Sequence, residues 1–450
     1  KFEVPAQPPA RHVVMSNFSK SSDVSISRRR FVTQAALASG GTSVATQLLY
    51  AQAGPTPAPS ERIQLGFIGV GGMGQFHLQW FAKQPDVQIV SVCDVDRNRF
   101  AAVENILQSK DYETYHDYRE LLTNESLDAV VVATPDHWHG LVAIAAARAG
   151  KGIYCEKPLT NSVGEGRALC DAVQENKVIL QTGSHERSNP GAAIAKKLIA
   201  EGRFGEIETV RIQLPTDEQH LQTVKNFKGV PPASDPPEGF DYNFWLGHTP
   251  EVPYTEKRCH FCWRFISSYG GGEMTDRGCH VIDLAQMILG LDDTGPTRIE
   301  ATGETPAPGL YDAFLDFEFE NRFASGLRMI GSNEGPRGVW FEGTEGKLFV
   351  SVHGAELTAE PAALLEDIRV PKKPHYVKHR REFLEAVKTG SPVIAPVEAG
   401  HRTATICHLN NLALRLGRSF NWDPTTEQSD DQEVNALLTP SMREPWSLES

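Results

Sequence analysis

Residues 63–74, IQLGFIGVGGMG, decide the fold of the first part of the chain. An apolar run ends there in three glycines, Gly69, Gly71 and Gly74, which are spaced G-x-G-x-x-G. Gly69 permits a sharp turn, Gly71 lets a pyrophosphate approach the backbone, and Gly74 lets the following helix lie close to the strand. The stretch therefore predicts a strand, a tight turn and a helix N-terminus, whose unpaired N–H groups attract phosphate. An ordinary glycine-rich loop would explain the glycines alone.

A second apolar run adds to this prediction. Residues 87–93 (VQIVSVC) follow the predicted helix and end at Asp94, where an acid binds the ribose hydroxyls of a dinucleotide. The glycines and this acid together predict a dinucleotide-binding site. We expect NAD rather than NADP, because the carboxylate of Asp94 would repel a 2′-phosphate. Arg97 would weaken that preference, unless it is a solvated surface arginine.

Length and composition exclude several classes of protein. A chain of 450 residues has room for two domains, and its 40% hydrophobic and 22% charged content is typical of soluble globular proteins. The net charge of −13 argues against a nucleic acid or an anionic membrane as partner. Seven scattered cysteines do not form a disulfide framework. Cys259 and Cys262 have no second pair, so we expect no zinc there; a disulfide between them after export remains open.

The first sixty residues predict a targeting signal and a linker rather than a folded domain. Residues 27–32 (SRRRFV) precede a stretch rich in Ala, Gly, Ser and Thr, which ends in an A-x-A site at residues 51–53. This order predicts a twin-arginine export signal and a periplasmic or otherwise exported protein, with Met15 as the initiator. A basic patch before a weak helix is the alternative. No later run is long enough to span a membrane, so we expect no span in the mature chain.

Polar loops follow two further predicted strands. Residues 129–133 (AVVVA) read as a buried parallel strand that ends at Thr134 and Pro135, and residues 152–155 lead into Glu156-Lys157-Pro158. Ligands lie at the carboxyl ends of parallel strands, so both loops should face the cofactor. Lys157 can then reach a substrate hydroxyl beside the nicotinamide. A surface ion pair between Glu156 and Lys157 would explain the same tripeptide.

Two histidines in the first of these loops resemble metal ligands. His137 and His139 lie two residues apart, but no third ligand is near them in the sequence. We therefore expect no metal. One histidine should orient the loop and the other should lie near the nicotinamide.

The pattern changes after Pro190, where alternating strands replace the βα repeat. Strand-like runs occur at residues 206–214, 297–302, 313–319, 324–332, 338–342 and 346–350. They predict an α+β domain with a mostly antiparallel sheet. Two helices, 377–387 and 398–416, should pack back on the first domain. The expected domains are a signal and linker over 1–60, a Rossmann domain over 61–187, an α+β substrate and oligomerisation domain over 188–424, and a polar tail over 425–450.

Residues 270–284 (GGGEMTDRGCHVIDL) contain the candidate chemistry. Asp276, His280 and Asp283 fall at i, i+4 and i+7 on one predicted helical face. A carboxylate one turn before an imidazole can fix its tautomer, which makes His280 a candidate general base. A satisfied histidine at a helix N-terminus explains the spacing equally well. The aromatic stretch 240–264 suits a sugar ring, although buried packing explains Trp245 equally well.

These motifs resemble the glucose–fructose oxidoreductase / inositol dehydrogenase (Gfo/Idh/MocA) family over about residues 63–416. The glycine loop, Asp94, the T-P-x-x-x-H of residues 134–139, the E-K-P at 156–158 and the stretch 269–284 occur in the family's order. The resemblance implies a catalytic set of Lys157, Asp276 and His280. We expect the cofactor to contact Gly69, Gly71, Gly72, Met73, Gly74, Asp94, Thr134, Pro135, His139, Glu156 and Lys157. We expect the substrate to contact Arg187, Trp263, Arg264 and His280.

The resemblance also implies an activity and an assembly. The expected reaction moves a hydride between the nicotinamide and a secondary alcohol of a sugar, cyclitol or derivative. A homo-oligomer is expected through the open face of the second sheet. One alternative is a related glycoside-cleaving enzyme that oxidises transiently; one such branch carries T-H-G where this chain has Thr275-Asp276-Arg277-Gly278. The other is a nucleotide-binding sensor without turnover.

Overall fold

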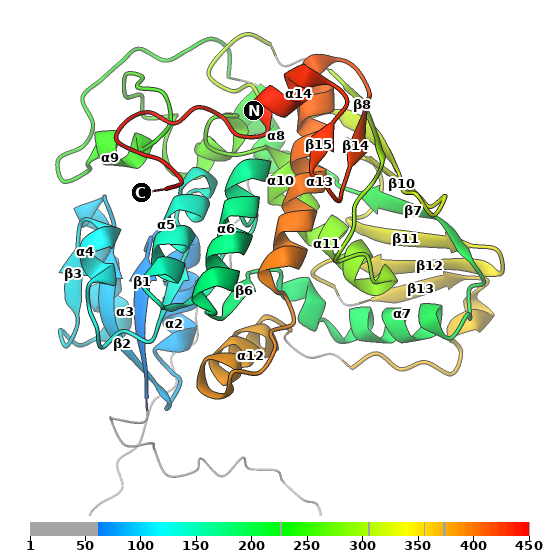
Figure 1. Cartoon of the computed structure of the whole chain (residues 1–450), viewed down its shortest axis with the longest axis horizontal. Coiled ribbons are helices and arrows are strands. Elements are labelled where there is room, and N and C mark those ends of the chain that lie inside the picture. The colour runs from blue at the N-terminus through cyan, green and yellow to red at the C-terminus, as the bar shows by residue number, and fades with distance from the viewer. Residues whose placement is uncertain (1–61, 226, 305–306, 355, 372–374, 450) are drawn as a thin grey trace, which may run out of the picture. The chain divides into compact units, whose positions relative to one another are not determined.

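A computed structural model describes residues 62–449 except 226, 305–306, 355 and 372–374 (Figure 1). The predicted export signal, Met15 and the linker lie outside these residues. The described chain folds into a parallel-sheet domain followed by a domain built on a mostly antiparallel sheet. The predicted fold class is therefore confirmed.

The first sheet has six parallel strands in the order β3-β2-β1-β4-β5-β6. Its strands are β1 (Ile63–Ile68), β2 (Val87–Cys93), β3 (Glu113–Tyr115), β4 (Ala129–Val132), β5 (Gly152–Cys155) and β6 (Leu180–Thr182). Its helices are α2 (Gly72–Phe81), α3 (Phe100–Leu107), α4 (Tyr118–Leu122), α5 (Asp136–Arg148) and α6 (Val163–Asn176). Helices on both faces explain why β4 is buried at every position. The strand order reverses between β1 and β4, so the loops after these strands meet at the ligand-binding edge.

The second sheet has nine strands in the order β13-β12-β11-β7-β10-β9-β8-β14-β15. They are β7 (Ile207–Gln213), β8 (Arg298–Gly303), β9 (Phe317–Arg322), β10 (Arg328–Ser332), β11 (Gly338–Gly343), β12 (Gly346–Ser351), β13 (Leu357–Glu360), β14 (Phe420–Asp423) and β15 (Gln428–Ser429). The β7–β10 pair is parallel, whereas the other pairs are antiparallel. The short helices α8 (Glu218–Lys225) and α9 (Tyr242–Leu246) lie in the long connection after β7.

Three helices bury one face of the second sheet. Apolar side chains of α7 (Pro190–Ala200), α11 (Gly278–Leu289) and α13 (Val397–Leu416) share one core with its strands. Strand β9 alternates between this core and the opposite face, with Phe317 and Phe319 inward. Our predicted strand began four residues too early, at 313, which placed Phe314 out of phase with the other two phenylalanines. In Figure 1, α13 runs between the two sheets.

The C-terminal residues 425–450 correct our expectation of a polar tail. They contain β15 and α14 (Gln432–Leu437), and Val434 and Leu438 are buried in the core of the second domain. Trp446 returns to the first domain, where its ring lies 4.9 Å from that of Trp138. Val434, Leu437 and Leu438 do stand at the helical spacing i, i+3 and i+4, but the pattern is confined to one short helix between polar residues, and the sequence prediction overlooked it.

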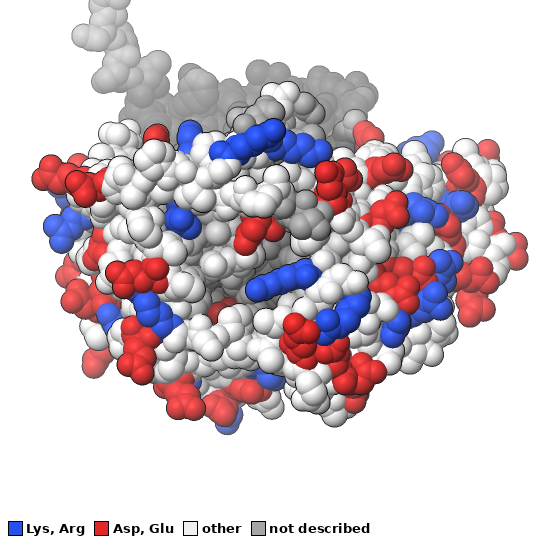
Figure 2. Space-filling model, turned by 90° about the horizontal axis from the view of Figure 1, so that it is seen from above, with Lys and Arg blue, Asp and Glu red and all other residues white. Residues whose placement is uncertain are grey.

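No described helix is long and apolar enough to cross a membrane. Figure 2 shows one face of the described residues, on which acidic and basic side chains are interspersed without a continuous basic patch.

Helix α12 (His375–Thr389) packs back on the first domain, as the sequence indicated. Phe383 and Leu384 are buried in the core of that domain. The carboxylate of Asp86 accepts hydrogen bonds from Arg381 at 2.6 and 3.0 Å and a further one from Lys388. Burial alone would raise the pKa of Asp86, but these two cations lower it to about 2.

Asp86→Asn should therefore destabilise the fold by about 1 kcal/mol at neutral pH, a value that allows for solvent screening of the partly exposed cations. The pKa of Asp86 is lower in the folded state than in the unfolded chain. Its contribution to stability is thus present above about pH 4 and is lost as the pH falls toward 2. Urea unfolding should show a difference between wild type and Asp86→Asn at pH 7 that shrinks below about pH 4. Asp111→Asn, at an exposed position, is the control; a difference that persists unchanged in acid would contradict the ion-pair explanation.

Candidate active site

The loop between β1 and α2 forms an open cradle bounded by tight packing. Gly69 has a φ of +85°, and a Cβ there would lie 2.7 Å from the backbone nitrogen of Thr134. A Cβ on Gly74 would overlap the carbonyl oxygen of Gly69. By contrast, a Cβ on Gly71 or Gly72 would have no heavy atom within 4 Å. The outer glycines are required by packing, and the middle ones leave space at the α2 N-terminus, as a pyrophosphate needs.

The acid after β2 lies beside this cradle. Asp94 accepts hydrogen bonds from the N–H groups of Val70 at 2.8 Å and of Asp96 at 2.9 Å. Burial raises the pKa of Asp94, and these two N–H groups oppose the shift. Met73 is 40% exposed on the first turn of α2. An open glycine cradle with an adjacent acid fits a dinucleotide, in which Asp94 would bind the ribose.

The loops after β4 and β5 are joined through His139. Its Nδ1 lies 2.6 Å from the carbonyl oxygen of Pro158, and its Nε2 lies 3.0 Å from that of Thr134. The Nε2 of His137 lies 2.8 Å from the carbonyl oxygen of Trp245. Both imidazoles are buried against backbone carbonyls, so the structure gives them a role in fixing loops. It disfavours the predicted contact of His139 with the cofactor.

The side-chain hydroxyl of Thr134 lies at the same edge of the sheet. It is buried and has no hydrogen-bond partner within the described chain. Thr134 and Pro135 precede α5 directly, and the loop lies at the point where the strand order reverses. An unpartnered hydroxyl at this edge fits a ligand that the described residues do not supply.

Glu156 and Lys157 point to different partners. The carboxylate of Glu156 is buried and lies 2.7 Å from the Nε2 of His77. Lys157 instead reaches the second domain, where its Nζ lies 2.7 Å from Oδ1 and 2.8 Å from the backbone oxygen of Asp276. The alternative of a surface ion pair between Glu156 and Lys157 is therefore wrong. Two predicted catalytic residues from separate domains meet in a direct contact.

Both members of the Lys157–Asp276 pair are charged. Burial would raise the pKa of Asp276, but the positive charges of Lys157, Arg264 and Arg277 hold it well below its usual range. Burial would lower the pKa of Lys157, yet Asp276 and then Asp136 raise it above its usual value. Lys157 is thus a cationic hydrogen-bond donor and not a base. Its side chain is only 9% exposed, so its charge acts in a largely dry environment.

The predicted helical face of Asp276 and His280 is interrupted. Helix α10 (Glu273–Asp276) ends at Asp276, Arg277 lies between the two helices, and α11 begins at Gly278. The i, i+4 relation assumes one continuous helix, so the break releases Asp276 toward Lys157. None of the hydrogen bonds between described residues joins Asp276 to His280. The geometry favours a role of Asp276 in holding the lysine rather than in orienting the histidine.

His280 is a buried, neutral imidazole next to two further histidines. The residue is 5% exposed, and its ring centroid lies 4.7 Å from that of His185 and 5.2 Å from that of His353. Burial lowers the pKa of His280 well below its ordinary value, and the charge of Lys157 adds to this effect. A neutral imidazole can accept a proton, as a general base must, but the lowered pKa makes His280 a weaker base than one whose pKa is matched to neutral pH.

Sequence reasoning missed His185 and His353 as site residues. His185 lies in the Gly183–Arg187 loop at the exit of β6, the last parallel strand, and that position could have indicated it. His353 follows β12 in the second domain, and nothing in its local sequence points to the site. Only the tertiary fold brings it to His280.

Three expected substrate contacts have different outcomes. Arg187 is buried and donates to Asp283 at 2.8 Å and to Asp292 at 2.7 Å, so this pairing disfavours a substrate contact. Trp263 is also buried and carries the guanidinium of Arg264 over its ring at 4.3 Å. Arg264 is partly exposed with its Nε 3.4 Å from Oδ1 of Asp276, which keeps it at the site.

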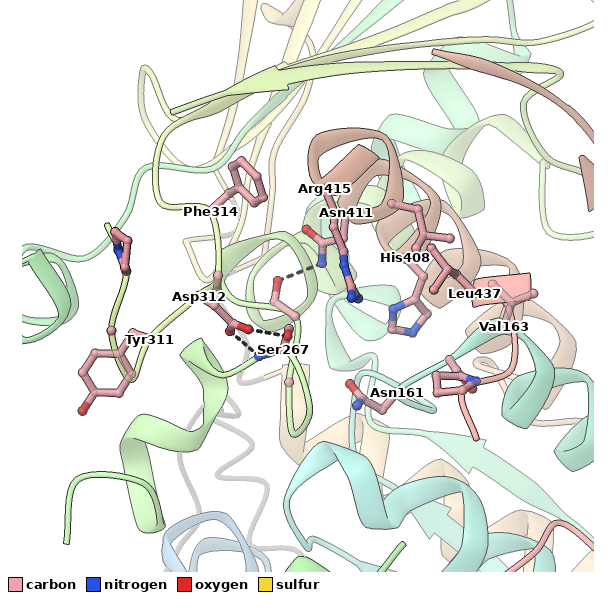
Figure 3. Close-up of a pocket in the computed structure, with 18 of the residues that line it drawn as sticks. Asn161, Val163, Ser267, Tyr311, Asp312, Phe314, His408, Asn411, Arg415 and Leu437 are labelled. Atoms are coloured by element: carbon pink, nitrogen blue, oxygen red, sulfur yellow. Dashed lines mark hydrogen bonds between the residues drawn. The ribbon is translucent and has the colours of Figure 1, made fainter. Parts of the chain in front are cut away.

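A cavity of about 510 Å³ lies behind the turn at Gly270 and Gly271 (Figure 3). Ser267 and Asp312 form one wall, joined by a 2.6 Å hydrogen bond. Polar side chains of α13 form another wall: His408, Asn411 and Arg415. Lys157, Asp276 and His280 do not line this cavity, so it adjoins the candidate chemistry without containing it.

The glycine cradle, its acid and the charged lysine define a site of the nucleotide-dependent oxidoreductase class. Comparison with known proteins agrees. The model of the oxidoreductase family NAD-binding Rossmann fold (GFO_IDH_MocA) matches residues 63–184, and that of the family's C-terminal alpha/beta domain (GFO_IDH_MocA_C2) matches residues 191–448. This chain belongs to the Gfo/Idh/MocA oxidoreductase family, and the predicted cofactor class, NAD, is confirmed.

Individual relatives are enzymes of sugar and cyclitol metabolism by name. Levoglucosan dehydrogenase of Pseudarthrobacter phenanthrenivorans is 30% identical over 237 residues, which span 51% of this chain and about half, 52%, of that enzyme. The scyllo-inositol 2-dehydrogenase (NAD(+)) of Bacillus subtilis is 26% identical over 75% of this chain and 90% of its own. The alpha-N-acetylgalactosaminidase of Shewanella oneidensis is 30% identical over 40% of this chain and 44% of its own.

Solved structures show the same fold. A levoglucosan dehydrogenase in complex with NADH and levoglucosan aligns with a TM-score of 0.61 at 22% identity, covering 80% of this chain and 99% of its own.

Proposed function

We propose that this protein is an exported NAD(H)-dependent oxidoreductase that transfers hydride between the nicotinamide and a secondary alcohol or ketone of a sugar, cyclitol or derivative. The observation that carries the proposal is the buried ammonium of Lys157, which Asp276 holds at 2.7 Å in the same site as the buried imidazole of His280. A cationic donor and a neutral base together are what oxidation of a hydroxyl requires. The names of the dehydrogenase relatives support sugars and cyclitols as substrate class.

Different residues accept the proton and stabilise the negative charge that develops on the reacting oxygen. His280 takes the proton of the hydroxyl, and Lys157 donates a hydrogen bond to the same oxygen and stabilises developing alkoxide. Asp276 keeps Lys157 charged and in place. Gly71, Gly72 and Asp94 would hold NAD, which when bound supplies the hydride acceptor.

The N-terminal sequence and the second sheet support two further parts of the proposal. The SRRRFV motif at residues 27–32 supports twin-arginine export to the periplasm. The face of the nine-stranded sheet away from the helices carries the Trp340–Phe349 pair, whose rings lie 5.1 Å apart. A partly exposed tryptophan, Trp340, packed on the buried Phe349 supports a homo-oligomer through that face.

The match to an alpha-N-acetylgalactosaminidase favours a second candidate, a glycoside-cleaving enzyme that oxidises its substrate transiently. Both candidates need NAD and the base His280. They differ in whether the oxidised sugar accumulates and whether an aglycone is released.

The proposal predicts bound NAD that responds to sugar. The mature chain should be purified without added nucleotide, denatured to identify the released nucleotide by mass, and scanned natively for nicotinamide fluorescence while sugars are added. We expect NAD, and fluorescence that rises with one sugar class in wild type but not in His280→Ala. Release of p-nitrophenol from an aryl glycoside without a lasting rise in fluorescence would favour the cleaving enzyme. A chain that binds no NAD would refute both, and sugar binding without hydride transfer in either variant would indicate a sensor.

A further inference from the structure

His185, Glu186 and His353 form a compact group of metal-binding side chains beside His280. His185 and Glu186 begin the short helix η3 (His185–Ser188) after β6, and His353 lies two residues past β12. The Nδ1 of His353 is 3.0 Å from Oε1 of Glu186, and the Nδ1 of His185 is 3.6 Å from the same oxygen. One donor atom from each of the three residues lies within 4.8 Å of the others.

We propose that these three residues bind a divalent transition-metal ion of the zinc class. Two imidazoles and one carboxylate are a donor set that Zn²⁺ takes, whereas Mg²⁺ and Ca²⁺ prefer oxygen donors. Bonds of about 2.0–2.2 Å in a tetrahedral site place neighbouring ligand atoms about 3.3 Å apart. The two distances to Glu186 lie on either side of that value, and the two imidazoles offer donor atoms within 4.8 Å of each other. Three protein ligands leave a fourth position for water or a substrate oxygen.

The carboxylate is fixed from behind, as metal ligands usually are. Oε1 of Glu186 accepts the backbone N–H of His353 at 3.1 Å, and Oε2 accepts from the side-chain amide of Asn189 at 3.0 Å. Such outer partners orient a ligand and raise metal affinity. The neighbouring Arg187 is engaged by Asp283 and Asp292. The competing explanation is that the imidazole of His353 simply donates a hydrogen bond to Glu186.

His280 gives an independent reason to expect a ligand here. Its Nδ1 is buried and has no hydrogen-bond partner in the described part of the chain. A buried donor or acceptor without a partner is costly unless a missing ion, water or ligand satisfies it. Its ring adjoins those of His185 and His353, with centroids 4.7 and 5.2 Å away. The charge of Lys157, which would repel a cation, is offset by Asp276.

A metal at this position has a use that rests on the proposed function. Its open position can hold a substrate hydroxyl or carboxylate beside the oxygen that His280 deprotonates. Metal binding itself does not depend on that function, because it needs only the three side chains.

The test measures metal content directly. The full-length mature chain is stripped with a chelator, titrated with Zn²⁺, dialysed and analysed for metal by mass spectrometry. We expect one Zn²⁺ per chain, and an affinity at least about 100-fold lower in Glu186→Gln and in His353→Asn, since changes to outer partners alone cost 10–100-fold. Asn tolerates the φ of +67° at position 353, so this variant removes the imidazole without backbone strain. His116→Ala, at a partly exposed histidine of the first domain, is the control and should retain the metal.

Two results would overturn the metal site. One is a stripped chain that retains no Zn²⁺; the other is equal retention by wild type, Glu186→Gln and His353→Asn, which would place the ion elsewhere. Circular dichroism of each variant shows whether it is folded, and replacement of Zn²⁺ by Co²⁺ adds a visible spectrum that reports four-coordinate nitrogen and oxygen ligands. NAD binding is measured on the same samples. If the chain binds NAD but no Zn²⁺, the metal site is refuted and the proposed function stands. If it binds Zn²⁺ but no sugar changes the nicotinamide fluorescence, the proposed function is refuted and the metal site stands.

Discussion

Lys157→Met is expected to lower kcat/KM for sugar oxidation by about 10³-fold or more, because it removes the only positive charge proposed to contact the reacting oxygen. Methionine keeps the length of the side chain but cannot donate a hydrogen bond to an alkoxide. Arg264 and Arg277 remain near Asp276, so the fold should tolerate the change. The loss should appear mainly in kcat, since an interaction that strengthens in the transition state is removed. Steady-state kinetics with a fixed NAD concentration measures it.

Two companion variants make this result specific. Lys196→Met changes an exposed lysine on α7 and should leave the kinetics unchanged. Lys157→Arg keeps the charge but not the compact ammonium between the two oxygen atoms of Asp276, so only partial activity should return. Activity of Lys157→Met within tenfold of wild type would rule out the proposed role of Lys157.

Gly74→Ala should have the second large effect, on the cofactor loop. Alanine favours a helix by about 1 kcal/mol over glycine. Here, however, its methyl group would overlap the carbonyl oxygen of Gly69, which is backbone and has no rotamer that relieves the clash. We expect the free energy of unfolding to fall by about 2–3 kcal/mol and NAD binding to weaken at least tenfold as the loop shifts.

Neighbouring glycines separate packing from cofactor contact. A Cβ on Gly71 or Gly72 meets open space, so Gly71→Ala and Gly72→Ala should keep the stability of wild type. Gly71→Ala should still weaken NAD binding, because its methyl group would enter the space expected for the pyrophosphate. Thermal unfolding with and without NAD separates the two effects. Equal stability of Gly74→Ala and Gly72→Ala would show that the loop is more plastic than its packing indicates.

The local sequence determined the parts of this protein that depend on neighbouring residues. The apolar run that ends in Gly69, Gly71 and Gly74 predicted a strand, a turn and a helix. These elements depend on backbone conformations and close contacts of the glycines themselves. The apolar run of β4 likewise predicted a buried parallel strand from neighbouring residues alone, and Asp94 at the end of the β2 run predicted the ribose contact. The E-K-P tripeptide placed Lys157 at the exit of a parallel strand, but by itself it did not exclude a surface ion pair with Glu156.

Only the tertiary structure decided which groups meet at the site. Whether Lys157 pairs with Glu156 or with Asp276 depends on a contact across 119 positions, and the break of the helix at Arg277 decides it. His353 comes beside His185 because β12 and η3 both pack against α7, a contact that no local pattern encodes. The burial of Trp446 depends likewise on a distant partner, Trp138. Short-range propensities thus specified the elements, whereas burial and charge pairing between distant segments specified the chemistry that they bring together.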